Sequence, residues 1–200
     1  MGTRNLTIVL KNREHKVAQY CQWDGYPEGQ GRTAYLLLKG NVAVIEQSLS
    51  KCQWITEEQI EQRWREAHVM CEVEWEGMEH GFRFEVGEAI KNLYPEMERS
   101  HGALILDSIM NSVGPIYLQD GIEFAANDTF CEWIWIVDFD NRVFQAFEPT
   151  KWHEYDAVEN QESYLDTLDL DIKMTKVLEL DLDDLPKSQD AFLASFSKRE

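Results

Sequence analysis

The chain has 200 residues, a length that suits one domain, and it is 44% hydrophobic with seven Trp, enough to bury a sizeable core. This composition excludes a disordered chain. The formal net charge of −18 is uneven: residues 1–100 carry 12 basic and 16 acidic side chains, and residues 101–200 carry 7 and 21. Such a negative field repels nucleic acid and anionic lipid, so we expect neither direct nucleic-acid binding nor membrane association.

The first elements predicted along the chain are a β-hairpin and three helices. Apolar residues alternate in 6–11, an extended run occupies 17–22, and a polar turn separates them, which predicts two paired strands. Helices are predicted at 33–39, at 42–50 and after Thr56. Thr56 and Gln59 have the spacing of a capping box, which marks the start of the third helix.

The middle of the chain is predicted to change from helix to strand. Residues 71–75 alternate like a strand, residues 82–86 form a short extended piece, and residues 102–110 have helical spacing. The strands predicted after this helix are 115–119, 132–137 and 142–147. The last two form a second hairpin around the turn 138–141. Because residues 133–137 are apolar on both faces, we expect their strand to be central in a covered sheet.

The C-terminal region combines strong negative charge with two short elements. Residues 154–184 carry eleven acidic side chains against Lys173 and Lys176, and they predict a loop followed by a strand at 177–182. A short terminal helix is predicted at 188–197. The whole chain, 1–200, is therefore expected to be a single globular domain of the α+β class. Its sheet would be mainly antiparallel, built from the N-terminal and C-terminal hairpins, with helices from the middle of the chain packed on it.

The cysteine spacing argues against a zinc site. Cys21, Cys52, Cys71 and Cys131 lie 31, 19 and 60 residues apart, without the close pairs that hold zinc. We expect reduced thiols, no metal and no cofactor. The N-terminal residues contain no apolar run of signal-peptide length, and no stretch approaches the ~18 apolar residues of a membrane span. A cytoplasmic location is therefore expected.

Residues 16–31 hold more aromatic rings and amides than a turn needs. Turns require only Gly, Pro and small polar residues. The side chains here and nearby that can stack on or hydrogen-bond to a ligand are Arg4, Gln19, Gln22, Trp23, Asp24, Tyr26 and Gln30. Arg4 could clamp a phosphate or carboxylate while the rings stack on a base. A structural explanation also exists, in which the rings close the edge of the core and Arg4 pairs with Asp24 or a Glu.

Four pieces of this N-terminal sequence carry a family resemblance. They read MGTRNLT, KVAQY, QWDGYP and GQG, at 1–7, 16–20, 22–27 and 29–31. With them the chain resembles a family of phage, bacterial and fungal proteins that share this opening and have no established activity. A looser similarity continues through 120–138 and 182–186. The resemblance implies a shared fold and a shared site in the N-terminal segment, and it supplies no mechanism.

Three functional hypotheses follow. The leading one is a small-molecule-binding protein that sequesters a nucleotide-like signalling ligand, a counter-defence role that the link to phages implies. The alternative is an acidic protein-interaction module, or a nucleic-acid mimic, that binds a basic protein partner through residues 154–184. The third is a hydrolase with Cys21, or Thr3 after processing, as its nucleophile, although no sequence motif supports either residue.

Overall fold

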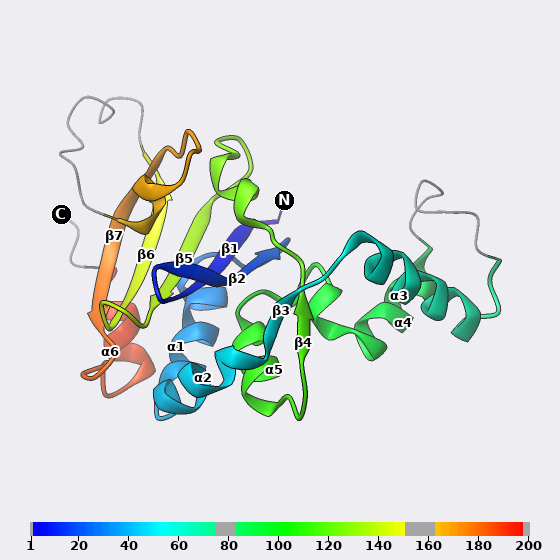
Figure 1. Ribbon diagram of the computed structural model, residues 1–200. Coiled ribbons are helices and arrows are strands. Elements are labelled where there is room, and N and C mark those ends of the chain that lie inside the picture. Colours follow the sequence, from blue (N-terminus) through cyan, green and yellow to red (C-terminus); the bar gives the residue numbers. More distant parts are fainter. Residues whose placement is uncertain (1, 75–82, 151–162, 198–200) are drawn as a thin grey trace.

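The structure is a computed structural model that describes residues 2–74, 83–150 and 163–197. Its main sheet has the strand order β2-β1-β5-β6-β7. The strands are β1 (Asn5–Lys11), β2 (Glu14–Cys21), β5 (Trp133–Asp138), β6 (Val143–Pro149) and β7 (Met174–Asp181). Strands β1 and β5 pair in parallel, and every other neighbouring pair is antiparallel (Figure 1). The predicted α+β class and mainly antiparallel sheet are confirmed, and β5 is the central strand, as predicted.

The turns of the two hairpins are tied together by one carboxylate. Asn12 and Arg13 both have positive φ, 59° and 62°, as a two-residue hairpin turn requires. In the other turn, Asp138 Oδ1 accepts hydrogen bonds from the backbone N–H groups of Asp140 and Asn141, each at 2.9 Å. Asp140 then accepts from the backbone N–H groups of Asn12 (2.9 Å) and Arg13 (2.7 Å). This link holds the two turns side by side, as the parallel pairing of β1 with β5 demands.

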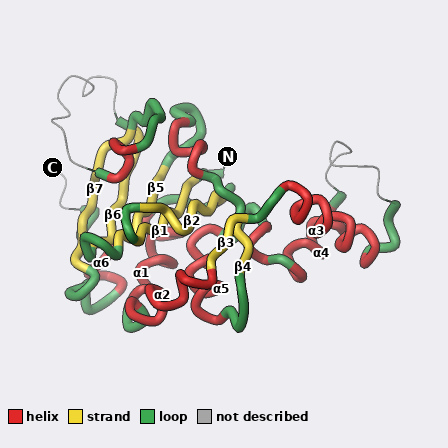
Figure 2. Tube along the Cα trace, in the orientation of Figure 1, coloured by secondary structure: helices red, strands yellow, loops and turns green. Residues whose placement is uncertain are grey.

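One face of the sheet is covered by helices. Figures 1 and 2 show them gathered on that side: α1 (Arg32–Leu38), α2 (Val42–Ser48), α5 (Ile105–Asn111) and α6 (Gln189–Ala194). Trp135 is fully buried between them and the sheet and stacks on Phe144, with ring centroids 5.8 Å apart. Tyr35 of α1 stacks on Phe192 of α6 at 4.7 Å. Aromatic packing of this kind accounts for much of the energy of this layer.

The opposite face of the sheet has a thinner cover. Two 3₁₀ turns lie there, η5 (Ile122–Ala126) and η7 (Tyr164–Thr167). The sheet residues of the core beneath these turns are Leu6, Ile8, Leu10, Ile134, Ile136 and Phe147. Strands β1 and β5 are therefore buried on both faces, in agreement with the apolar pattern of residues 133–137.

A helical arm projects from the sheet. It consists of α3 (Glu57–Met70) and α4 (Phe84–Leu93), drawn to the right of the sheet in Figure 2. In the chain, the arm lies between β3 (Cys52–Trp54) and β4 (Ile116–Leu118), which pair as a two-stranded parallel sheet. The capping box predicted at Thr56 and Gln59 is confirmed, with both reciprocal hydrogen bonds present. Within the described ranges, no helix has the length and apolar character needed to cross a membrane.

Two predictions at the tip of this arm are wrong. In place of a strand at 71–75, Cys71 and Glu72 form the turn that ends α3, while residue 75 lies outside the described residues. In place of an extended piece at 82–86, the described residues from Phe84 onward begin α4. This segment forms a helix because its apolar residues have helical spacing. Helix α4 buries three of them in a small core with Ala67 of α3: Val86, Ala89 and Ile90. Strand β3 was not predicted, because it forms by pairing with β4, a segment far away in the sequence, and no local pattern indicates that pairing.

The C-terminal predictions are largely confirmed. The strand predicted at 177–182 is β7, although it begins earlier, at Met174. The terminal helix is α6, and Ser188 Oγ accepts the Ala191 backbone N–H at 3.2 Å as its N-cap. Residues 154–162 of the acidic segment lie outside the described residues.

A nearly buried ion pair joins the arm to the rest of the chain. Arg63 Nη1 of α3 lies 2.7 Å from Glu96 Oε1 of η3 (Pro95–Met97), and their side chains are only 14% and 10% exposed. The Arg63 guanidinium also lies over the rings of Tyr94 (4.5 Å) and Tyr117 (5.6 Å). This residue therefore connects α3, the segment after α4 and strand β4.

Replacing Arg63 with Met should destabilise the protein by about 3 kcal/mol, because Glu96 would remain buried without its counter-charge. Chemical denaturation would measure the change in the free energy of unfolding. The double variant Arg63→Met, Glu96→Gln should recover part of the loss, since it removes the unpaired charge. Equal stability of the single variant and the unsubstituted protein would contradict this account.

Candidate functional site

The loop that follows β2 is held against the central strand. Trp135 Nε1 donates a buried hydrogen bond to the Gly25 carbonyl at 2.8 Å. A Cβ at Gly31 would lie 2.3 Å from Cη2 of the same indole, and a Cβ at Gly25 would lie 2.8 Å from the Thr3 carbonyl oxygen. Such distances leave no room for a side chain. Two of the glycines predicted to belong to a ligand loop are thus required for close packing.

The three glutamines of the predicted site hydrogen-bond within the protein. Gln30 Oε1 accepts the backbone N–H of Ala103 at 2.8 Å. Gln22 Oε1 accepts from the Tyr20 hydroxyl at 2.7 Å. Gln19 is buried, and its Nε2 donates to the Tyr20 carbonyl at 3.3 Å. The amides therefore fix the conformation of the loop and of the end of β2.

The other loop residues of the predicted site reach the surface. Trp23 is 46% exposed, and one side of its ring lies against Gly2, where a Cβ would be 2.3 Å from Trp23 Cε3. Tyr26 is 40% exposed and donates a hydrogen bond to Asp24 Oδ1 at 3.1 Å, which raises the pKa of Tyr26. Asp24 has a φ of 57°, so the chain turns sharply there. Both rings remain accessible to a ligand.

Arg4 does not pair with Asp24. Its guanidinium lies over the ring of Phe130, 4.4 Å from the centroid. Its contacts with Glu132 involve the backbone: Arg4 N donates to Glu132 Oε1 (3.3 Å), and Glu132 N donates to the Arg4 carbonyl (3.0 Å). In the part of the chain that the structure describes, Arg4 forms no ion pair with a carboxylate.

A second arginine, which the sequence did not reveal, lies at the same place. Arg99 Nη2 donates to Gln22 Oε1 at 3.2 Å, and Gln22 N donates to the Arg99 carbonyl at 2.7 Å. Burial raises the pKa of Tyr20, and the nearby guanidinium groups of Arg4 and Arg99 act in the opposite direction. We call Arg4, Tyr20, Gln22 and Arg99 the arginine cluster. Arg99 follows a weakly patterned segment 77 residues from Gln22, and no motif connects the two.

The arginine cluster borders a small cavity of about 100 Å³. Its lining residues are Ala18, Gln19, Tyr20, Met97, Glu98, Arg99, Gln119 and Gly121. This volume suits a few water molecules, since each occupies roughly 30 Å³ of liquid. A ligand larger than that would lie across the surface of the cluster.

Cys21 is poorly placed to be the nucleophile of the hydrolase hypothesis. It is fully buried, burial raises the pKa of its thiol, and its Sγ donates to the Trp23 carbonyl at 3.2 Å. All four cysteines are free thiols, and burial raises the pKa of Cys52 and Cys131 to about 12. Among the described residues, no three His, Cys, Asp or Glu side chains are grouped so as to hold a metal ion.

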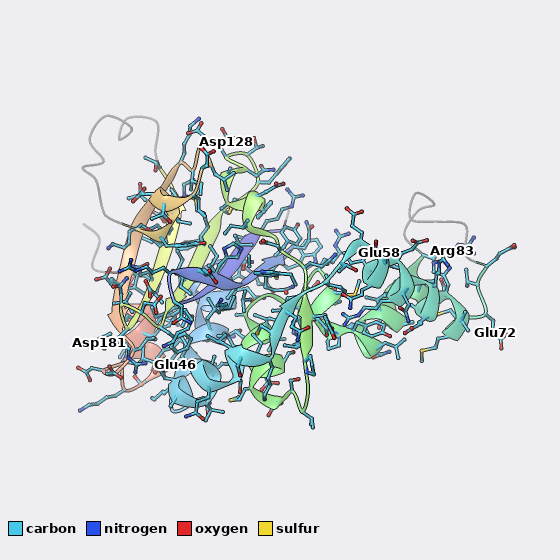
Figure 3. The ribbon with its side chains drawn as sticks, in the orientation of Figure 1. Glu46, Glu58, Glu72, Arg83, Asp128 and Asp181 are labelled. Atoms are coloured by element: carbon cyan, nitrogen blue, oxygen red, sulfur yellow. The ribbon has the colours of Figure 1, made fainter. Side chains whose placement is uncertain are left out.

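The negative charge is spread over the molecule. Figure 3 labels Glu46 and Asp181 near one end of the sheet, Asp128 near the other, and Glu58 and Glu72 on the arm.

Several described acids of the C-terminal half have cationic partners. Asp171 lies 3.3 Å from Lys173, and Arg142 pairs with Asp183.

Comparisons of the chain with protein-family models, with curated proteins and with solved structures each give no match.

The packing of the loop on Trp135 can be tested with two glycine substitutions. Gly31→Ala should destabilise the protein by about 1–3 kcal/mol, because its Cβ meets the indole ring. Gly114→Ala is the matched control, since nothing lies within 4 Å of a Cβ there. The midpoint of urea unfolding should fall for the first variant only. Equal midpoints would show that the loop does not rest on this ring.

Proposed function

We propose that this protein binds a small anionic ligand with an aromatic group, of the nucleotide class, at the arginine cluster and the adjoining Trp23. The observation that carries the proposal is the pair Arg4 and Arg99. Both guanidinium groups lie near the Tyr20 hydroxyl, and neither forms an ion pair within the described residues. The role that we assign is sequestration of the ligand.

The chemistry of the cluster suits a phosphate. Guanidinium groups present several N–H donors in a plane and form strong, charge-assisted hydrogen bonds to phosphate oxygens. In a chain with a net charge of −18, two unpaired arginines beside a hydroxyl are a local exception to the overall field. Selective recognition of an anion would explain why these two cations are kept without carboxylate partners.

The exposed rings supply the other half of the recognition. Trp23 directly follows Gln22 of the cluster, and the residue is 46% exposed. Stacking of a base on such a ring contributes about 1–3 kcal/mol and tolerates different bases. Tyr26 and Asp24 lie next in the same loop and offer a hydroxyl and a carboxylate to the sugar or base.

The family resemblance supports the same location. The shared opening contains Arg4 and the exposed residues Trp23 and Tyr26, whereas Arg99 lies outside it. The link to phages favours a signalling nucleotide as the ligand, because removing such a molecule from solution requires binding without turnover. This proposal therefore assigns no catalytic residue to the cluster.

Calorimetric titration with adenosine and guanosine mono- and triphosphates and with cyclic dinucleotides would test the proposal. Arg99→Gln should raise the Kd at least about tenfold, because a charge-assisted hydrogen bond contributes about 1.5–3 kcal/mol. Lys187→Gln is the matched control, since it removes one exposed positive charge just before α6, remote from the cluster in the sequence. Absence of binding at millimolar nucleotide, or equal effects of the two variants, would overturn the proposal.

Trp23→Ala tests the stacking half separately. It should weaken binding by about 1–3 kcal/mol while leaving one cooperative unfolding transition, because the ring is only partly buried. Thermal unfolding with and without the nucleotide would measure both effects. A variant that fails to fold would instead identify Trp23 as part of the core and remove the ring from the proposed site.

A further inference from the structure

A hydrogen-bonded chain of three titratable side chains lies near the other end of β2 from the arginine cluster. The Tyr164 hydroxyl is 2.7 Å from His15 Nδ1, and His15 Nε2 is 3.0 Å from Asp120 Oδ2. The three residues come from β2, from the segment before η5 and from η7. None of the functional residues discussed above belongs to this chain.

The fold brings these residues together through sheet register and local caps. His15 pairs with Leu10 of β1, whose side chain belongs to the core beneath η5 and η7. Gly121 N donates to the Ala18 carbonyl at 3.0 Å, which brings the preceding residue, Asp120, alongside β2. Tyr164 is the first residue of η7, which Ser163 caps.

The order of donors and acceptors follows from the chemistry of the groups. A carboxylate can only accept, so we assign the proton of the imidazole to His15 Nε2. The lone pair of Nδ1 then accepts the Tyr164 hydroxyl proton. Asp120 Oδ1 also accepts the Ile122 backbone N–H at 3.0 Å, and the Trp54 ring lies 5.3 Å from the imidazole. The imidazole is therefore held at both nitrogens and along one side.

Tyr164 is the member of this chain that lines a large cavity. The cavity, of about 1200 Å³, lies over the sheet face near the hairpin turns, and neither His15 nor Asp120 is among its lining residues. Its wall combines apolar surface with side chains of both charges, including Arg13, Asp138, Lys176 and Glu179. A polar molecule of substrate size fits this volume.

We propose that the Tyr164 hydroxyl is a nucleophile that accepts an acyl group from a polar ester or acyl amide held in this cavity. The Oη–carbon bond forms as the bond from the acyl carbon to the leaving group breaks. The hydroxyl proton passes to His15 Nδ1 and from there to the leaving group. Asp120 is a positioning residue that keeps the Nε2 proton in place. A carboxylate, an imidazole and a hydroxyl in this order are the arrangement that acyl transfer uses on unrelated folds.

The need for a base is clear from the surroundings of the hydroxyl. Burial raises the pKa of Tyr164, so the resting hydroxyl stays protonated at neutral pH. Attack on a carbonyl therefore requires that the proton leave at the same time, and His15 Nδ1 lies within hydrogen-bond distance to accept it. This inference is independent of the arginine cluster.

Acetylation by N-acetylimidazole, followed by peptide mass spectrometry, tests the proposal on the intact protein. At neutral pH, Tyr164 should be acetylated faster than Tyr26, because the imidazole of His15 accepts the Tyr164 hydroxyl proton during the attack. Tyr26 is the internal control, because its hydroxyl contacts a carboxylate and no imidazole, and this carboxylate raises the pKa of Tyr26. If Tyr164 is acetylated no faster than Tyr26 at neutral pH, the proposal is wrong.

The variant His15→Gln distinguishes a role of His15 as proton acceptor from a purely structural role. Loss of the base should slow acetylation of Tyr164 roughly 100-fold and leave Tyr26 unchanged. If His15 only anchors η7, its loss would expose Tyr164 further, and the rate would stay equal or increase. Either of those two results would overturn the proposal.

Asp120→Asn tests the positioning role. Removing the carboxylate should slow acetylation of Tyr164 at neutral pH and leave Tyr26 unchanged, because the imidazole loses the partner that holds its Nε2 proton. An unchanged rate for Tyr164 would exclude Asp120 from the chain of proton transfer.

Discussion

The indole N–H of Trp135 is the interaction on which the rest of this structure depends. It is fully buried, and a buried donor must be paired, so the Gly25 carbonyl has to approach the central strand at this point. That single hydrogen bond fixes the chain just after β2, and Gly31 then passes against the same ring to begin α1. Neighbouring Trp133 stacks on Trp135 at 5.4 Å and extends the aromatic layer toward α6.

This constraint divides the N-terminal motif into two sets of residues. Gly25, Gly31 and Gln30 are needed by the fold, since they pack on Trp135 or hold the Ala103 backbone N–H. The side chains of Trp23 and Tyr26 take no part in these contacts with Trp135 and Ala103, and they remain exposed. A ligand site in this segment therefore consists of the second set together with cations that arrive from elsewhere in the chain.

Local patterns in the sequence predicted the local structure correctly, but they did not predict which distant segments pair with each other. The hairpins, the capping box at Thr56 and the cap at Ser188 depend on residues within a few positions of one another, and all are present. The link from Asp140 to the first hairpin spans 128 residues, and the contact of Tyr164 with His15 spans 149. Only the three-dimensional packing of the sheet determines such neighbours, so Arg99 and Tyr164 could not be assigned beforehand.

The two proposed sites lie near opposite ends of strand β2. His15 and Tyr20 are five positions apart on one strand, and a strand rises about 3.3 Å per residue, so their backbones lie about 17 Å apart. Substitutions at that separation, with no shared contact, act independently of each other. The segment 119–121 runs beside β2 between them, with Asp120 at one site and Gln119 at the small cavity of the other. Each site can therefore be tested by substitution without disturbing the contacts of the other.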